Sequence, residues 1–187
     1  MRPTRLTHLL LSFAAAALLS SGVQAAPQND EMDKLLAEKG LLMQIDNVRA
    51  SVSTKASELV VNAMGFLGVP YKRGGNSAET GFDCSGFVRA MYEQSIGLML
   101  PRRAEQQAAA TQNIEKRDLQ PGDLVFFNTM RRAFSHVGIY VGDGKFIHSP
   151  RSGSEVRVEN MGVSYWAQRF DGARRVQTTQ AAPPTGE

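Results

Sequence analysis

The feature that most constrains the fold is a change of residue pattern at "QPGD", residues 120–123. Before this point, apolar residues recur at the three- and four-residue spacing of helices. After it, short apolar or alternating runs are separated by turn residues, which is typical of strands. A chain that places its helices first and its strands afterwards is typical of the α+β class. We therefore predict N-terminal helices packed on an antiparallel sheet.

Three helices are expected before the change of pattern. The first covers "KASELVVNAMGFLG", with Ser53 or Thr54 as its N-cap. Its apolar stripe is predicted to consist of Val60, Val61, Met64 and Leu67. The second helix should run from Cys84 to about Ile96. The third is the short segment "PRRAEQQAAATQ", which has Pro101 near its first turn.

Strands are expected after the change. Residues 124–128 form one, and "HVGIYV" and "KFIHS" form a hairpin around the turn "GDG". The sequence leaves the register of this hairpin open by one residue, which would turn the side chains to the opposite face. "EVRVENM" is predicted as another strand, "SYWAQRF" as a short helix and "GARRV" as a closing strand at the sheet edge.

The first 25 residues are typical of a secretory signal peptide. Arg2 and Arg5 precede the apolar run "LLLSFAAAALL", and "VQA" ends in a small residue. We expect cleavage after Ala25 and a periplasmic or secreted protein without a lipid or membrane anchor. Residues 26–52 should form an extension, either a short packed helix or a mobile arm. Residues 53–176 should form the compact domain, and 177–187 a disordered tail.

Charge gives no reason to expect a nucleic-acid partner. Loss of Arg2 and Arg5 with the signal peptide reduces the formal net charge from +3 to about +1. A nearly neutral chain lacks the basic excess that binds phosphate backbones. We predict a monomer that binds no nucleic acid.

The lone cysteine, Cys84 in "GFDCSGFV", is unusual in an exported protein, where cysteines normally pair. Asp83 is a good N-cap, so Cys84 falls in the first turn of a helix. Free backbone N–H groups and the helix dipole favour a thiolate there. Gly81 and Gly86 leave room for another chain to approach. A buried structural cysteine is the alternative, and these features favour a reactive one.

The two histidines that remain after signal removal, His136 and His148, lie on either side of the "VGDG" turn. A hairpin brings both rings to the same end of neighbouring strands. Cysteine and histidine in reach of each other form a nucleophile and its general base. We predict His136 as the base for Cys84, and His148 as the residue that holds its ring and fixes its tautomer. A neutral second histidine stabilises an imidazolium less than a carboxylate would.

The negative charge that forms on an attacked carbonyl needs hydrogen-bond donors. The backbone N–H of Cys84, at the start of a helix, is one candidate. Tyr71 in "GVPYKRGG" is the second, because its hydroxyl lies in the loop before the nucleophile. A half-buried packing role for Tyr71 is equally compatible with the spacing.

The motifs "GVPYKRGG", "GFDCSGFV", "LPRRAEQQ", "LQPGDLVFF" and "SHVGIYVGDGKFIHSP" follow in this order over about residues 56–176. In this the chain resembles the NlpC-type family of papain-like cell-wall cysteine peptidases. The resemblance implies a circularly rearranged papain-like fold and hydrolysis of amide bonds in peptidoglycan stem peptides through a thioester acyl-enzyme. It implies Cys84 as nucleophile, His136 as base, His148 as third member and Tyr71 beside the oxyanion. Asp83 and Ser85 match positions that contact the substrate's amino end.

Other functions stay open on the sequence. The same fold could support a thiol acyltransferase or an amidase. Cys84, His136 and His148 could instead bind zinc, a reading that we disfavour, so we expect no metal and no cofactor. A wall-binding protein without catalysis is a further alternative, although the intact triad argues against it. Arg102–Arg103 and Arg131–Arg132 are interpreted as solvated surface charge.

Overall fold

The computed structural model describes residue 34 and residues 40–177. The chain divides into two units, and the second, which begins at Gln44, contains the sheets and the site. The predicted signal peptide, most of residues 26–40 and the tail from 178 onward lie outside the described residues. Within the described part, no helix is long and apolar enough to cross a membrane.

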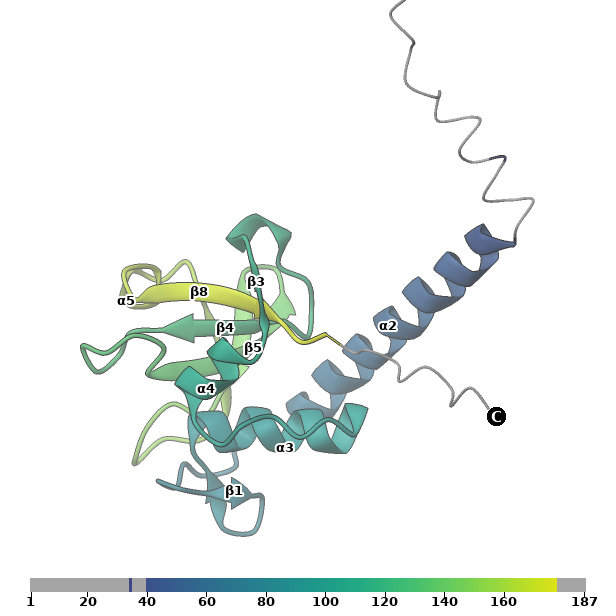
Figure 1. Ribbon diagram of the computed structural model, residues 1–187. Coiled ribbons are helices and arrows are strands. Elements are labelled where there is room, and N and C mark those ends of the chain that lie inside the picture. The colour runs from purple at the N-terminus through teal and green to yellow at the C-terminus, as the bar shows by residue number, and fades with distance from the viewer. Residues whose placement is uncertain (1–33, 35–39, 178–187) are drawn as a thin grey trace, which may run out of the picture. The chain divides into compact units, whose positions relative to one another are not determined.

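The second unit is built on a six-stranded antiparallel sheet with the strand order β3-β8-β4-β5-β6-β7 (Figure 1). A separate two-stranded sheet pairs β1 with β2. The strands are β1 (Asn76–Ser77), β2 (Gly81–Phe82), β3 (Gln112–Ile114), β4 (Leu124–Phe127), β5 (His136–Gly142), β6 (Lys145–His148), β7 (Arg157–Asn160) and β8 (Phe170–Arg175).

In residues 40–177 the helices that accompany the sheets are α2 (Leu41–Met64), α3 (Cys84–Ile96), α4 (Ala104–Ala109) and α5 (Ser164–Ala167). A single 3₁₀ turn, η1, covers Lys116–Asp118. Helices α2 to α4 precede all six strands of the main sheet in the sequence. The short strands β1 and β2, which form the separate sheet, lie between α2 and α3. The predicted α+β class with an antiparallel sheet is therefore confirmed.

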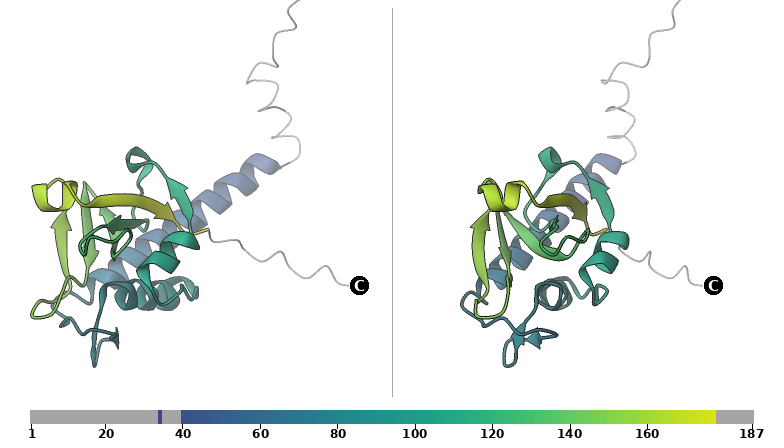
Figure 2. Two further views of the ribbon diagram at one scale, coloured as in Figure 1. Left: turned by 60° about the vertical axis from the view of Figure 1, so that its left-hand side comes forward. Right: turned by 90° about the vertical axis from the view of Figure 1, so that its left-hand side faces the viewer.

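Strand β4 shows how the sheet separates two apolar layers. All four of its side chains are buried, and successive side chains of a strand point to opposite faces. Leu124 and Phe126 belong to the larger cluster, to which α2, α3 and α4 contribute. Val125 and Phe127 belong to the smaller cluster around Trp166 of α5. The sheet is thus covered by three helices on one face and by α5 on the other (Figure 2).

The first predicted helix begins earlier than expected. The helix α2 starts at Leu41, directly after Gly40, and contains no glycine or proline. Ser53 and Thr54 lie inside it, so the N-cap prediction is wrong. Inside the helix, the hydroxyl of Thr54 is satisfied because it donates to the Ala50 carbonyl at 2.9 Å, four residues back.

The predicted apolar stripe of this helix is also wrong. From Ser53 onward, where every side chain of this helix is described, the buried ones are Leu59 and Ala63, four residues apart, whereas Val61 is 72% exposed. Met64 and Leu67 are exposed as well. The small residue Ala63 is fully buried in the larger core cluster, which side-chain hydropathy alone does not indicate.

The second predicted helix agrees with α3 at both ends, and its predicted apolar side is buried. The third is shorter than expected, because α4 begins at Ala104 and leaves Pro101 outside it. The predicted edge strand "GARRV" is internal, since β8 lies between β3 and β4. The actual edge, β3, has only three mostly exposed residues and shows no strand pattern in the sequence.

The hairpin of β5 and β6 turns at Asp143 and Gly144, with φ angles of 51° and 69°. A turn with positive φ at both central residues matches the twist of the flanking strands. Gly142 pairs with Lys145, but Tyr140 pairs with Phe146, so the register shifts by one residue at a bulge. Because of this bulge, the pairing of residues next to the turn does not predict which residues pair near His136 and His148.

Candidate active site

Cys84 is the first residue of α3, as predicted. The carboxylate of Asp83 caps the helix by accepting from the backbone N–H of Gly86 at 2.7 Å. Gly86 also lies against the loop before β1, where a Cβ added to it would come within 2.1 Å of the Gly75 carbonyl oxygen. The start of α3 is therefore fixed by its cap and by a backbone contact that only glycine permits.

The two histidines occupy neighbouring ends of the hairpin strands. His136 is the first residue of β5 and His148 is the last residue of β6. Nε2 of His136 lies 2.7 Å from Nδ1 of His148, so one ring donates to the other. Between them, Gly138 makes room, because a Cβ there would lie 2.7 Å from the Phe146 ring and 3.1 Å from the Cβ of His148.

Apolar rings enclose the histidine pair. Trp166 stacks on His136 with ring centroids 5.5 Å apart, and it meets His148 edge-on at 5.1 Å. His136 is 3% exposed and His148 is fully buried. Both imidazoles are thus held in fixed orientations in a largely dry environment.

A cleft of about 690 Å³ joins the helix start to the hairpin. Cys84, His136 and Tyr71 all line it. The backbone of Val137, next to His136, acts to lower the pKa of the Cys84 thiol. Three side chains predicted from separate motifs are therefore brought together at one surface.

The protonation state of Cys84 differs from the expectation. Burial raises the pKa of the Cys84 thiol to about 11, and the carboxylate of Asp83 acts in the same direction. Backbone N–H groups of Val137 and Ser85 and the charge of Arg102 oppose this but do not outweigh it. The helix start thus acts toward a thiolate, as predicted, but burial and Asp83 outweigh it, and the raised pKa favours the thiol form of Cys84 at neutral pH.

The imidazoles rest in their neutral form. Burial, and then the charge of His148, hold the pKa of His136 well below its usual value. Burial also lowers the pKa of His148, although Glu159 acts against this. A neutral His136 beside a neutral thiol is able to accept the thiol proton.

Tyr71 is tethered between the segment before the nucleophile and a more distant loop. It forms an isolated bridge with Phe82, and its backbone N–H donates to the Ser154 carbonyl at 2.8 Å. Burial, followed by the charges of Cys84 and Asp83, raises the pKa of the Tyr71 phenol. Tyr71 thus offers a neutral O–H donor at the cleft.

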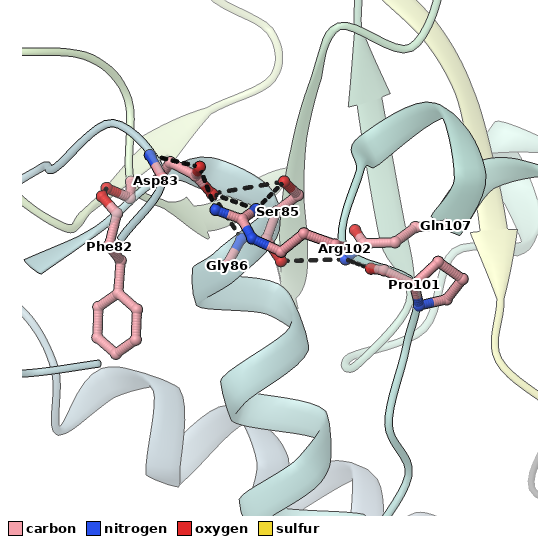
Figure 3. Close-up of polar contacts among 9 residues, drawn as sticks. Phe82, Asp83, Ser85, Gly86, Pro101, Arg102 and Gln107 are labelled. Atoms are coloured by element: carbon pink, nitrogen blue, oxygen red, sulfur yellow. Dashed lines mark hydrogen bonds and ion pairs between the residues drawn. The ribbon is translucent and has the colours of Figure 1, made fainter. Parts of the chain in front are cut away.

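Asp83 and Ser85 are held by Arg102 (Figure 3). The guanidinium contacts both carboxylate oxygens of Asp83, at 2.9 and 2.6 Å, and the Ser85 hydroxyl at 3.0 Å. Gln107 adds a bond of 3.0 Å to the Ser85 carbonyl. Neither Asp83 nor Ser85 is among the residues that line the cleft. Arg102, interpreted from the sequence as solvated surface charge, instead has a structural partner.

Several residues of the cleft were not singled out from the sequence. They are Arg73, Arg151 and Arg157, the carboxylate Glu159, and the exposed apolar side chains Met130, Val163 and Tyr165. They come from loops, from β7 and from α5, and only the folded chain brings them together at the cleft. A basic residue beside each of two motifs, in "YKRGG" and "HSPRSG", is the one signal that could have indicated the arginines.

The arrangement of the rings does not suit a metal ion. Among residues 34 and 40–177, no three His, Cys, Asp or Glu side chains are grouped as metal ligands. The facing nitrogens of His136 and His148 are 2.7 Å apart, which leaves no space for a cation between them.

Comparison with known proteins agrees with the geometry. A model of the NlpC/P60 family matches residues 68–175, which include all the residues discussed above as nucleophile, base and donors. The chain belongs to the NlpC/P60 family. The resemblance drawn from the sequence motifs, and with it the papain-like α+β fold, is confirmed.

Individual NlpC/P60 relatives carry names that describe their activities. The chain is 44% identical over 128 residues to the murein DD-endopeptidase MepH of Escherichia coli, covering 66% of this chain and 47% of that protein. It is 40% identical over 129 residues to the gamma-DL-glutamyl hydrolase of Bacillus subtilis, covering 68% and 31%. The chain therefore spans about half, or less, of these curated relatives.

A solved structure supports the same fold. An NlpC/P60 family protein from Bacillus cereus superimposes with a TM-score of 0.60 at 38% identity, covering 64% of this chain and 39% of that one.

Proposed function

We propose that this protein is an extracytoplasmic cysteine endopeptidase that hydrolyses amide bonds in peptidoglycan stem peptides through a thioester acyl-enzyme. The observation that carries the proposal is the cleft that Cys84, Tyr71 and His136 line together. The names of the relatives, a murein DD-endopeptidase and a gamma-DL-glutamyl hydrolase, support the same class of substrate.

In the first half of the reaction, the sulfur of Cys84 attacks the carbonyl carbon while His136 takes the thiol proton. Because both groups are neutral at rest, proton transfer accompanies the attack. The backbone N–H of Cys84 and the hydroxyl of Tyr71 donate to the developing oxyanion. His136 then gives the proton to the leaving amine as the C–N bond breaks, and the acyl group remains on sulfur.

In the second half, a water molecule attacks the thioester carbonyl and gives a proton to His136. The C–S bond breaks, the sulfur regains the proton from His136, and the product leaves with a new carboxyl group. His148 holds the His136 ring in one orientation through both halves, since its Nδ1 stays bonded to Nε2 of His136.

The charge of the cleft supports an acidic peptide as substrate. Arg73, Arg151 and Arg157 line the cleft, and stem peptides carry carboxylates. Arg157 is already paired with Glu159 at 2.6 Å. Arg73 and Arg151 are exposed, and neither forms an ion pair within the described residues. These two are the arginines that we propose to bind substrate carboxylates.

The roles of Asp83 and Ser85 need a separate proposal. If they receive the substrate's amino end, the ammonium group must share the Asp83 carboxylate with Arg102. A carboxylate already engaged by a bidentate guanidinium attracts a second cation less strongly. We propose that both residues mainly fix the start of α3.

A thiol acyltransferase or amidase would use the same acyl-enzyme and differ only in the acceptor or the bond. Because Cys84 lines a cleft of about 690 Å³, both an amine and water could reach the acyl-enzyme, and products must distinguish these functions.

The test is digestion of purified muropeptides of defined structure with the wild-type protein and with Cys84→Ala, followed by mass spectrometry of the products. We expect the wild type to release fragments with a new carboxyl and a new amino terminus, and Cys84→Ala to release none. Cleavage by Cys84→Ala at the wild-type rate would refute the proposal. A product joined to an added amine would indicate acyl transfer instead.

A further inference from the structure

Glu159 of β7 lies beside the buried histidine pair. The register of β6 and β7 pairs Phe146 with Glu159 and His148 with Arg157, so these side chains share one face of the sheet. Oε2 of Glu159 is 3.3 Å from Nε2 of His148. The carboxylate therefore stands on the side of His148 that faces away from His136.

Two further groups hold the Glu159 carboxylate in this place. A guanidinium nitrogen of Arg157 lies 2.6 Å from Oε1, and the indole N–H of Trp166 donates to Oε2. The interaction with His148, together with the charges of Arg157 and the Trp166 bond, lowers the pKa of Glu159 despite its partial burial. Glu159 is thus ionised at neutral pH and can only accept hydrogen bonds.

Nε2 of His148 needs such an acceptor. It is buried, and within the described residues it has no well-aligned hydrogen-bond partner. Buried polar groups in proteins are almost always paired. A small rotation of the Glu159 carboxylate converts the 3.3 Å separation into a charge-assisted bond.

The tautomers of both rings follow from this contact. A carboxylate at Nε2 of His148 requires the proton to be on that nitrogen, so Nδ1 of a neutral His148 can only accept. The group facing Nδ1 is Nε2 of His136 at 2.7 Å, and this nitrogen must then carry the proton of His136. The remaining nitrogen of His136, Nδ1, is left without a proton.

We propose that Glu159 is a positioning residue that fixes the tautomers of His148 and His136, and so keeps Nδ1 of His136 free to accept the proton of Cys84. This inference rests on the proposed function, because it assigns Glu159 to the same reaction. It also supplies the carboxylate that a pair of neutral histidines lacks. When His136 becomes an imidazolium, the negative charge lies at the far end of the hydrogen-bonded pair.

The first test measures the tautomers directly in the wild-type protein. Long-range ¹H–¹⁵N spectra distinguish protonated from unprotonated imidazole nitrogens at neutral pH. We expect both His136 and His148 to carry their proton on Nε2. Finding the proton of His148 on Nδ1 would overturn the proposal, without any variant and without substrate.

The second test compares Glu159→Gln with Glu155→Gln, which removes the same charge from an exposed position outside the residues that line the cleft. The glutamine amide at 159 can donate to Nε2 of His148 and thereby reverse the tautomers. We expect Glu159→Gln to lose the single tautomer pattern and to react with iodoacetamide at Cys84 about tenfold more slowly at neutral pH, equivalent to one pKa unit. Glu155→Gln should match the wild type in both measurements.

The other charged and titratable groups that face Cys84, namely Asp83, Arg102, Tyr71 and His136, are unchanged in both variants. Their effects on the alkylation rate therefore cancel. If Glu159→Gln keeps the wild-type tautomers and reacts with iodoacetamide at the wild-type rate, the role of Glu159 is refuted. Neither measurement uses peptidoglycan. If the proposed function fails, the wild type will therefore still show both protons on Nε2 but will not cleave muropeptides.

Discussion

Because two neutral histidines are buried, the free energy of unfolding should decrease when the pH falls into the mildly acidic range. His136 is 3% exposed and His148 is fully buried. Burial lowers the pKa of both rings in the folded protein, with the charge of His148 adding to the effect on His136. In the unfolded chain each imidazole binds a proton near pH 6.5. Since the unfolded chain binds more protons as the pH falls, stability is fully present above about pH 6.5 and decreases below it.

The size of the effect follows from proton linkage. A histidine that stays neutral when folded, with an unfolded pKa of about 6.5, loses at most about 2 kcal/mol of stability between pH 7.5 and 5.0. His136 should approach this limit. His148 should contribute less, because Glu159 favours its protonated form. The pair together should cost about 2–4 kcal/mol, a large share of the ~5–15 kcal/mol of a typical domain. The lowered pKa of Glu159 acts in the same direction only at more acidic pH.

The assay is urea unfolding at pH 7.5 and 5.0, followed by the fluorescence of the single tryptophan, Trp166, which stacks on His136. His136→Gln serves as the matched variant, because it removes one titrating ring. We expect its loss of stability between the two pH values to be less than half that of the wild type, because His148 alone then titrates on unfolding. Equal unfolding free energies of the wild type at both pH values, or an unchanged pH dependence in His136→Gln, would refute the reasoning.

Three further predictions concern the start of α3 and the residues that line the cleft. Gly86→Ala should reduce the free energy of unfolding by about 1–3 kcal/mol or more, measured by urea unfolding, because its Cβ would meet the Gly75 carbonyl oxygen at 2.1 Å; wild-type stability would contradict this contact. Tyr71→Phe should lower kcat by about 100-fold with little change in KM, as loss of an oxyanion donor does, and an effect on KM alone would assign Tyr71 to binding. Arg151→Ala should raise KM for muropeptides with little change in kcat, whereas Lys145→Ala on the exposed hairpin tip should change neither.

The parts of the fold that the sequence predicted are those with a strong local signal. The helix from Cys84 to Ile96 has a capping aspartate at its start and a glycine with φ of 74° after its end. The strand Leu124–Phe127 is a continuous apolar run. Local patterns of this kind are sufficient because a capping aspartate, a glycine after the helix and an unbroken apolar run each favour one local structure.

The parts that the sequence did not predict depend on tertiary contacts. The strand β3 has three mostly exposed residues and forms only because β8 offers an unpaired edge. The buried face of α2 is decided by Leu59 and Ala63, which lie against the sheet, rather than by its most apolar residues. The existence of β3 and the buried face of α2 therefore depend on tertiary packing, which overrides local propensity.

The candidate site shows the same division. Cys84, Tyr71, His136 and His148 could be singled out from residue chemistry and from the family motifs. Glu159 could not, because its approach to His148 depends on the register of two strands joined by the loop 149–156. The protonation state of Cys84 also required the structure, since burial and Asp83 together exceed the opposing effect of the helix start.

The sulfur belongs to the first turn of a helix, and both imidazoles belong to a hairpin more than fifty residues further along the chain. No continuous segment holds the reacting atoms, and the backbone of Val137 in β5 lowers the pKa of Cys84 in α3. A loosened state that keeps its helices and strands but lets α3 separate from the hairpin would retain its far-ultraviolet circular dichroism and lose the proposed hydrolysis. Because burial is the main cause of the raised pKa of Cys84, the same state would react faster with small electrophiles. Faster alkylation together with lost hydrolysis is therefore the sign of lost tertiary order in this protein.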